Sequence, residues 1–467
     1  MNDRARLKDV EYVLHGEKGP GVTGDIAYAV YVAALLGGTY GFTVARAVFA
    51  TSGPIWVREH LLTPAAAVVA AALFVALLLA ARWAGSRRGP VVPPLSWTDV
   101  VVTSEIDRAR SVRRWWTYVF VGGIAGGTIL GAILGGGVWA SRSGGWTWLP
   151  GAMATGALAG WVLMRVWLDG QVAAGGSGPM TLKRLAPRVA APLRLLRLDD
   201  LRVHGARSTH MGGGVLAGDL RAVRLELAAP VTRGRTLRLR SSGPWATVVR
   251  RDILGLRRVP GAFWTGAVLS VVGAAGVAWS LTDPLVPWIL TGGAIAACYL
   301  GMGAWSEGLR LVGDNAGTPP LLGLRFRTEA PAHLVVPTVL FAITSLTMSA
   351  VVLLTRNGPV PLDTPQTIAV PAWCLIIAAL LAGTPLLAAF RGLPAMNAFL
   401  PEQGPMLMAS WYAVPVAVSI LSGTLIVSRA TRSDIPALGL AIALATVAGV
   451  VAWGLHRVKV LEEAHRI

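Results

Sequence analysis

Charged side chains and cysteines are both scarce in this chain. Only 14% of the 467 residues are Asp, Glu, Lys or Arg, whereas 54% are hydrophobic. This composition excludes an ordinary water-soluble protein and is typical of polytopic helical membrane proteins. The two cysteines, Cys298 and Cys374, both lie in apolar runs, so the sequence supports neither a disulfide framework nor a zinc site.

The chain also lacks the short motifs of phosphate binding and common hydrolytic chemistry. It contains no GxxxxGK[ST] loop, no HExxH, no GxSxG and no paired CxxC. The group His204, His210, Asp199, Asp200 and Asp219 matches no metal-ligand spacing, and its histidines are expected to be solvated. We therefore expect no enzyme activity, metal or cofactor in this chain, and an integral-membrane transferase is disfavoured.

Apolar runs of about 20 residues recur along the chain, which is the length that a helix needs to cross the hydrocarbon layer. Backbone amides inside lipid must be paired within their own segment, so these runs are expected to be helices. The first run is too long for a signal peptide and is expected to be retained. The ten predicted spans are residues 26–50, 61–81, 116–139, 149–168, 263–281, 286–305, 335–354, 368–390, 411–427 and 436–455.

The basic residues indicate the orientation of these spans. The chain has 42 Lys and Arg against 24 Asp and Glu, a net charge of +18. With both termini in the cytoplasm, about 35 of the 42 basic residues lie inside and about 5 outside, as the positive-inside rule favours. The sequence thus predicts an all-α, multi-pass protein of the cytoplasmic (plasma) membrane with cytoplasmic N and C termini.

Three parts are expected along the chain. Residues 1–168 would form a first transmembrane half of four spans with a cytoplasmic insert at 82–115, and residues 261–467 a second half of six spans. Residues 169–260 form a basic cytoplasmic linker, which opens with a glycine-rich break at 175–179. Its arginines could dock an acidic partner or contact anionic lipid headgroups. Nucleic-acid binding is not expected, because no aromatic interleaving or known binding fold accompanies the charge.

An amphipathic helix is predicted at 245–258, directly before the fifth span. Apolar side chains at helical spacing form one face and arginines another, which is typical of a helix lying in the membrane interface. A shorter apolar stripe beside basic residues precedes the first span. Two spans, a cytoplasmic insert and two more spans follow each of these helices, so we infer a pseudo-repeat of four spans and four spans with a closing pair. The apolar face consists of Trp245, Val248, Val249, Ile253 and Leu256.

Small residues dominate one face of the third span. Gly123, Gly127, Gly131 and Gly135 recur every four residues, and such faces let helices pack closely. Static packing is the favoured interpretation, and a sliding or gating seam is the alternative.

Ionisable residues are rare at the centre of the spans. Arg46, Arg165, Asp169 and Glu307 lie close to span ends, where long side chains can extend to the interface. Ion-driven transport usually needs a charged residue near the midplane, so this mechanism is disfavoured.

Three stretches carry a family resemblance. The first has the pattern "GP…W…S-x-x-DR", formed by Gly89 and Pro90, then Trp97, then Ser104 through Asp107 and Arg108. Residues 249–260 and 390–394 provide two further motifs. Together they resemble a poorly characterised actinobacterial family of ABC-exporter-like (ABC-2-type) permeases. Permeases of this type usually have six spans per half, whereas four are predicted in the first half here. Either two are missing or the pseudo-symmetric partner is another chain.

The resemblance implies a permease subunit that exports a hydrophobic or amphipathic substrate. ATP and Mg would bind to a separate cytoplasmic ATP-binding subunit, expected in two copies, and the permease would pair as a homodimer or with a second permease chain. A non-transporting membrane scaffold or sensor, which recruits soluble partners through the basic inner segment, is the alternative. The candidate contacts with the ATPase are Glu105, Asp107, Arg108, Arg250, Arg251, Asp252 and Arg391.

Overall fold

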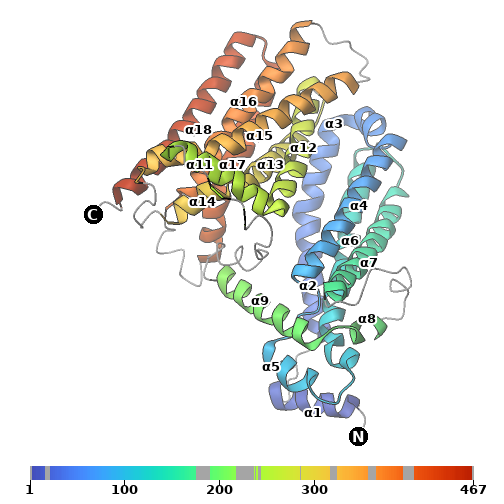
Figure 1. Cartoon of the computed structure of the whole chain (residues 1–467). Coiled ribbons are helices and arrows are strands. Elements are labelled where there is room, and N and C mark those ends of the chain that lie inside the picture. Colours follow the sequence, from blue (N-terminus) through green and yellow to red (C-terminus); the bar gives the residue numbers. More distant parts are fainter. Residues whose placement is uncertain are drawn as a thin grey trace. The chain divides into compact units, whose positions relative to one another are not determined.

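The structure is a computed structural model in which the described residues are all helical or connecting. It describes residues 3–15, 22–174, 190–216, 236, 238–239, 243–283, 285–315, 323–355, 364–392 and 404–464. The chain divides into two compact units, Met1–Ala229 and Pro230–Ile467, coloured blue to green and green to red in Figure 1. The linker expected at 169–260 is therefore shared between the two units, and its glycine-rich break lies outside the described residues.

Ten helical segments of the described chain are long and apolar enough to cross a membrane, which confirms the predicted all-helical, multi-pass class. Each coincides with one predicted run. The largest differences lie at ends that are expected to be cytoplasmic, where five of these helices continue for six to nine residues beyond the predicted span. The segments are Val30–Ala50, Pro64–Arg87, Arg108–Ala140, Trp148–Ala174, Pro260–Thr282, Trp288–Trp305, Phe326–Thr355, Thr367–Ala389, Ser410–Arg432 and Pro436–Ala464.

Unit 1 is built around three long helices that lie side by side, α4 (Pro64–Arg87), α6 (Arg108–Ala140) and α7 (Trp148–Ala174) (Figure 1). The first span packs against α6 and consists of α2 (Val22–Leu36), a π-helical turn η1 (Gly37–Gly41) and α3 (Phe42–His60).

Among the described helices, the α6–α7 pair makes the most extensive contact, and the glycine face predicted in the third span lies in it. A methyl group added at Gly127 would collide with the backbone carbonyl of Gly156, and one at Gly131 with that of Ala152. The same substitution would meet Met164 at Gly123 and the carbonyl of Trp148 at Gly135. Backbone therefore packs directly on backbone along this seam.

A layer of short helices packs on one end of the α4–α6–α7 bundle (Figure 1). It contains α1 (Asp3–His15), α5 (Leu95–Trp97), the π-helical turn η2 (Thr98–Val102), α8 (Ala190–Arg194) and α9 (Leu198–Leu216). Trp97, Val101, Leu196 and Leu201 share one buried hydrophobic cluster. The insert at 82–115 and the start of the linker thus form a common core, which we call the end layer.

Unit 2 contains the other six spans, α12 (Pro260–Thr282), α13 (Trp288–Trp305), α15 (Phe326–Thr355), α16 (Thr364–Ala389), α17 (Gly404–Arg432) and α18 (Pro436–Ala464). Their core holds Cys298 and Cys374 as buried free thiols. Two shorter helices accompany the spans: α14 (Glu307–Asp314), and α11 (Pro244–Arg258), which corresponds to the predicted amphipathic helix.

Candidate functional site

The end layer is fixed to α7 through the backbone of Val91, which directly follows the Gly89–Pro90 motif. Val91 exchanges two hydrogen bonds with the side chain of Gln171 on α7: its amide donates at 3.1 Å and its carbonyl accepts at 2.8 Å. A methyl group at Gly89 would overlap that side chain. Glycine at this position therefore leaves room for the Gln171 side chain that holds the insert.

Two candidate coupling residues of the insert are half-buried and contact α8 or the residue Leu196 that follows it. The Asp107 carboxylate accepts from Arg194 at 3.2 Å. Arg108 Nη1 donates to the carbonyl of Leu196 at 2.8 Å. In contrast, the Glu105 side chain is 93% exposed and lies 3.8 Å from Arg6. Of the three insert residues, Glu105 is thus the most exposed.

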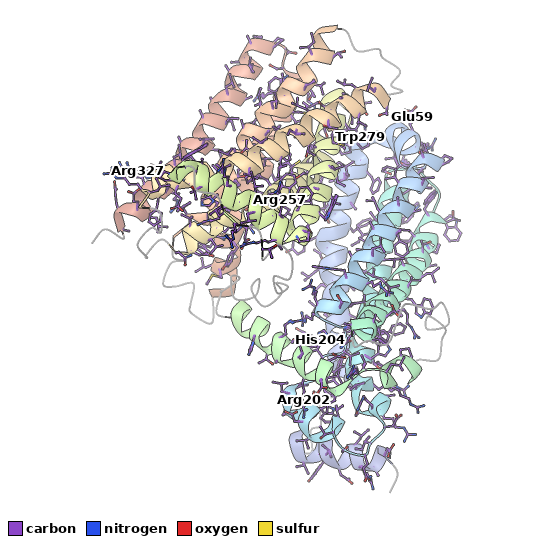
Figure 2. The ribbon with its side chains drawn as sticks, viewed as in Figure 1. Glu59, Arg202, His204, Arg257, Trp279 and Arg327 are labelled. Atoms are coloured by element: carbon purple, nitrogen blue, oxygen red, sulfur yellow. The ribbon has the colours of Figure 1, made fainter. Side chains whose placement is uncertain are left out.

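Helix α9 is docked on the insert by an ion pair and a buried histidine. Arg202 Nε donates to Asp99 at 2.8 Å, and His204 Nδ1 accepts from the amide of Gly89 at 3.3 Å. Figure 2 shows Arg202 and His204 on α9, at the opposite end of unit 1 from Glu59. Burial, reinforced by the nearby Arg207, lowers the pKa of His204 from its ordinary value.

The expectation that both histidines of this segment are solvated is wrong for His204. That side chain is buried, whereas His210 is exposed, and Asp219 lies outside the described residues. Burial was missed because the segment was interpreted as a polar loop, whereas it forms a helix that packs on the insert. The described residues contain no group of three His, Cys, Asp or Glu side chains able to hold a metal ion.

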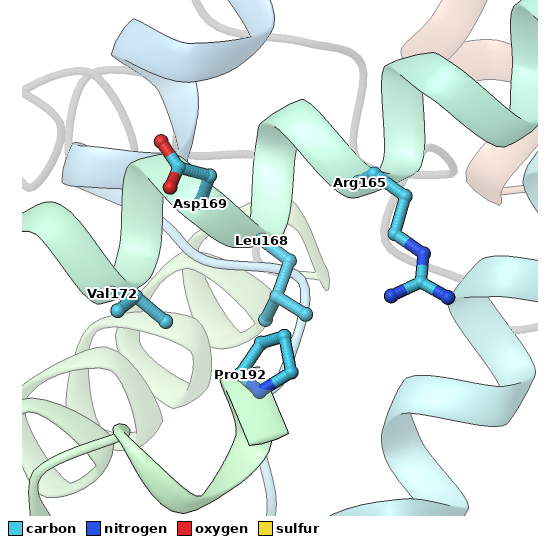
Figure 3. A pocket seen from close by; sticks show the side chains of 5 residues that line it. All are labelled: Arg165, Leu168, Asp169, Val172 and Pro192. Carbon is cyan, nitrogen blue, oxygen red and sulfur yellow. The ribbon is translucent and has the colours of Figure 1, made fainter. Parts of the chain in front are cut away.

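A charge cluster also lies inside unit 1, near the end layer. The Arg82 guanidinium donates to the Asp169 carboxylate at 2.6 Å. Arg165 and Asp169 are only 4% and 6% exposed, and both line a small pocket (Figure 3). Both side chains are thus enclosed by neighbouring helices of unit 1 and do not lie on its outer surface.

Unit 2 contains a second buried cluster, which joins α11 to α15. His333 on α15 is fully buried, and its Nδ1 lies 2.7 Å from Asp252 Oδ2 on α11. On the other side of the ring, Nε2 lies 3.3 Å from Arg251 Nη2 and 3.7 Å from Glu329 Oε1. An imidazole and two carboxylates are thus shielded from water, and the half-buried Arg251 lies beside them. We call these four residues the α11–α15 cluster.

Helix α14 completes the enclosure of this cluster. A methyl group at Gly308 would collide with Asp252 Oδ1 and His333 Nδ1. Glycine at this position therefore lets the α14 backbone close over the Asp252–His333 contact. Sequence analysis missed His333 and Glu329, although their spacing of four residues at the start of a long helix was a usable signal.

The side chains of α11 are distributed differently from the expectation. Arg251 and Asp252, which were candidates for contact with a partner, point towards α15 and contact His333 there. Arg250 and Arg257 are on the exposed surface of the helix, and Figure 2 shows Arg257 on α11. Trp245 and Ile253 are 47% and 40% exposed, which suits a face directed at lipid.

Arg391, the last candidate, is stacked against aromatic rings. Its guanidinium carbon lies 4.5 Å from the ring centroids of both Trp411 and Tyr412 on α17, and its Nε donates to Ala388 at 2.9 Å. Burial lowers the pKa of Arg391. The residue therefore links the end of α16 to α17, while residues 393–394 of the motif lie outside the described residues.

Comparisons with protein-family models, curated proteins and solved structures find no match to this chain.

Proposed function

We propose that this chain is the transmembrane permease subunit of an ATP-driven ABC-type exporter. It would move a hydrophobic or amphipathic substrate with energy from a separate cytoplasmic ATP-binding subunit, present in two copies. The main support is the α11–α15 cluster, which joins an amphipathic helix with exposed arginines to a membrane span through the Asp252–His333 contact at 2.7 Å.

This contact gives a route for mechanical work. A partner that pushes on Arg250 or Arg257 displaces α11, and Asp252 transmits the displacement to His333 on α15. Breaking a buried charged contact is costly, so the two helices move together. The second resembling stretch, 249–260, covers most of α11 and its junction with α12, and is thus the part of the chain where coupling is expected.

Purification of the full chain from its native membrane tests this proposal. We expect ATPase activity to accompany the chain, and to be lost in Arg250→Glu/Arg257→Glu because the exposed face of α11 then repels an acidic contact. Arg432→Glu, on the last turn of α17, removes the same type of charge at the end expected to be extracellular and is the matched control. Soluble partners that co-purify without ATPase activity would contradict transport and support the scaffold alternative.

A further inference from the structure

The α11–α15 cluster places a carboxylate on each side of one buried histidine ring. The His333 side chain is 0% exposed, and those of Asp252 and Glu329 are only 7% and 8% exposed. Asp252 Oδ2 lies 2.7 Å from Nδ1, and Glu329 Oε1 lies 3.7 Å from Nε2. Two buried carboxylates therefore face the two nitrogens of the same imidazole.

The protonation of this imidazole decides whether the cluster is electrically balanced. Asp252 and Glu329 each carry one negative charge, and Arg251, whose Nη2 lies 3.3 Å from Nε2, carries one positive charge. With a neutral ring one negative charge remains, and a buried charge without a counterion is costly. A proton on His333 brings the net charge of the four residues to zero. The imidazole takes this proton because it is the stronger base, with an ordinary pKa of about 6.5 against about 4.3 for a glutamate.

The helices around the ring supply no alternative countercharge in the described part of the chain. Helix α14 meets the cluster through Gly308, which has no side chain. Helices α12, α13 and α16 contain no charged residue. On α18, Glu462 lies 3.6 Å from Arg327 instead. The balance of charge thus depends on the four residues of the cluster and on the proton that they hold.

Arg251 offers a competing arrangement. Its Nη2 can donate to an unprotonated Nε2 at 3.3 Å, which leaves the ring neutral beside the buried Glu329 carboxylate. Arg251 is half-buried, so water can solvate its guanidinium, whereas Glu329 is enclosed. Protonation of the ring, which neutralises the enclosed group, is therefore the better arrangement.

We propose that His333 is a proton-binding site that is occupied when α11 is docked on α15. The residue lies just before the predicted span 335–354, at the end expected to be cytoplasmic, and the proton is thus exchanged with the cytoplasm. When α11 moves away, Asp252 leaves the ring, and a histidine in water is mostly unprotonated above about pH 6.5. Docking then takes up one proton above this pH.

The direction of the pH dependence follows from this uptake. The contribution of the proton to docking is fully present below about pH 6.5 and falls as the pH rises, by up to about tenfold per pH unit in the docking equilibrium. If α11 couples ATP hydrolysis to the spans, which rests on the proposed function, cytoplasmic pH would set how firmly α11 is held.

Nitrogen-15 NMR of the histidine-labelled full chain in lipid bilayers reads the ring directly. At about pH 7.5, where a histidine in water is mostly neutral, we expect one ring with both nitrogens protonated, and its signal should be absent from His333→Gln. Glu329→Gln removes the second carboxylate at nearly the same shape and should leave a neutral ring. Glu463→Gln is the matched control, because Glu463 is a half-exposed carboxylate on α18, and should leave the signal unchanged.

Hydrogen exchange of the Pro244–Arg258 amides, corrected for intrinsic rates, measures the link to docking. Opening of α11 should increase from about pH 6.5 to about pH 8.5 in the wild type, and this increase should be absent from His333→Gln. The wild type alone gives the protonation state and the pH dependence, so a variant that does not fold leaves both decided.

Three results would overturn the proposal. A neutral His333 ring in the wild type at about pH 7.5 would favour the Arg251 contact, and an unchanged ring in Glu329→Gln would show that this carboxylate does not hold the proton. Opening of α11 that does not depend on pH would exclude the link to docking. These measurements need no ATP-binding partner, so failure of the proton site is distinguished from failure of the proposed function, which co-purification tests.

Discussion

At the scale of single residues, the helix seam of unit 1 depends on the absence of side chains. Gly126 and Gly127 are neighbours on α6, but only Gly127 faces the α7 backbone, and a methyl group at Gly126 meets open space. Their sequence context is nearly the same. The same substitution at the two positions therefore distinguishes the effect of packing from the effect of helix propensity.

We predict that Gly127→Ala destabilises the protein by about 1–3 kcal/mol, the usual cost of overpacking, because the carbonyl of Gly156 must move. Gly126→Ala should be neutral or slightly stabilising, since alanine favours helix more than glycine does. Thermal unfolding in detergent measures both. Equal effects of the two substitutions would show that α6 and α7 do not pack through this face.

The Asp252–His333 contact predicts an energetic coupling between α11 and α15. Asp252→Asn and His333→Gln should each destabilise the protein, and the double variant should cost less than their sum by about 0.5–3 kcal/mol. Gly308→Ala should resemble Asp252→Asn, because its methyl group displaces the same carboxylate. Denaturation of the wild type, the two single variants and the double variant in one detergent gives the coupling free energy between Asp252 and His333. Additive effects of the two substitutions would contradict the contact.

At the scale of secondary-structure elements, α9 should be sensitive to pH. Burial lowers the pKa of His204 below its ordinary value of 6.5, so the undocked helix binds more protons than the docked one. Docking is then fully stabilised above pH 6.5 and weakens as the pH falls below that value. Acidification should release α9.

Hydrogen exchange of the Leu198–Leu216 amides between pH 7 and pH 5, corrected for intrinsic rates, measures this release, with α4 as the internal reference. His204→Asn keeps an acceptor for the Gly89 amide but does not titrate, and should remove the pH dependence. His210→Asn is the control, because His210 is exposed on the same helix. A pH response that persists in His204→Asn would contradict the assignment.

The helices show what could be predicted from sequence. Hydrophobic run length fixed all ten spans, because the lipid imposes one length on every crossing helix. It could not place Arg165 and Asp169, whose positions near a span end fit either a snorkelling or a buried side chain. Two other features depend on contacts between residues far apart in the chain, which hydrophobic periodicity cannot predict. These are the docking of α9 on the insert and the close approach of Gly308 to His333.

At the scale of the whole molecule, the predicted orientation can be tested with thiol reagents. The native cysteines are buried, and the background labelling should therefore be low. Glu105→Cys and Thr147→Cys flank α6, Arg108–Ala140, at its two ends, and both positions are exposed. We expect a membrane-impermeant maleimide added to intact cells to label Thr147→Cys but not Glu105→Cys. The reverse pattern would place the end layer outside the cell.

The direct backbone contact between α6 and α7 limits how unit 1 can deform. Two helices whose backbones touch have little room to rotate against each other, so we expect α6 and α7 to move as one rigid unit. Bending within unit 1 is then expected in the first span, where the π-helical turn at Gly37–Gly41 interrupts the regular hydrogen-bond pattern between α2 and α3. We therefore expect that turn to act as a hinge within unit 1.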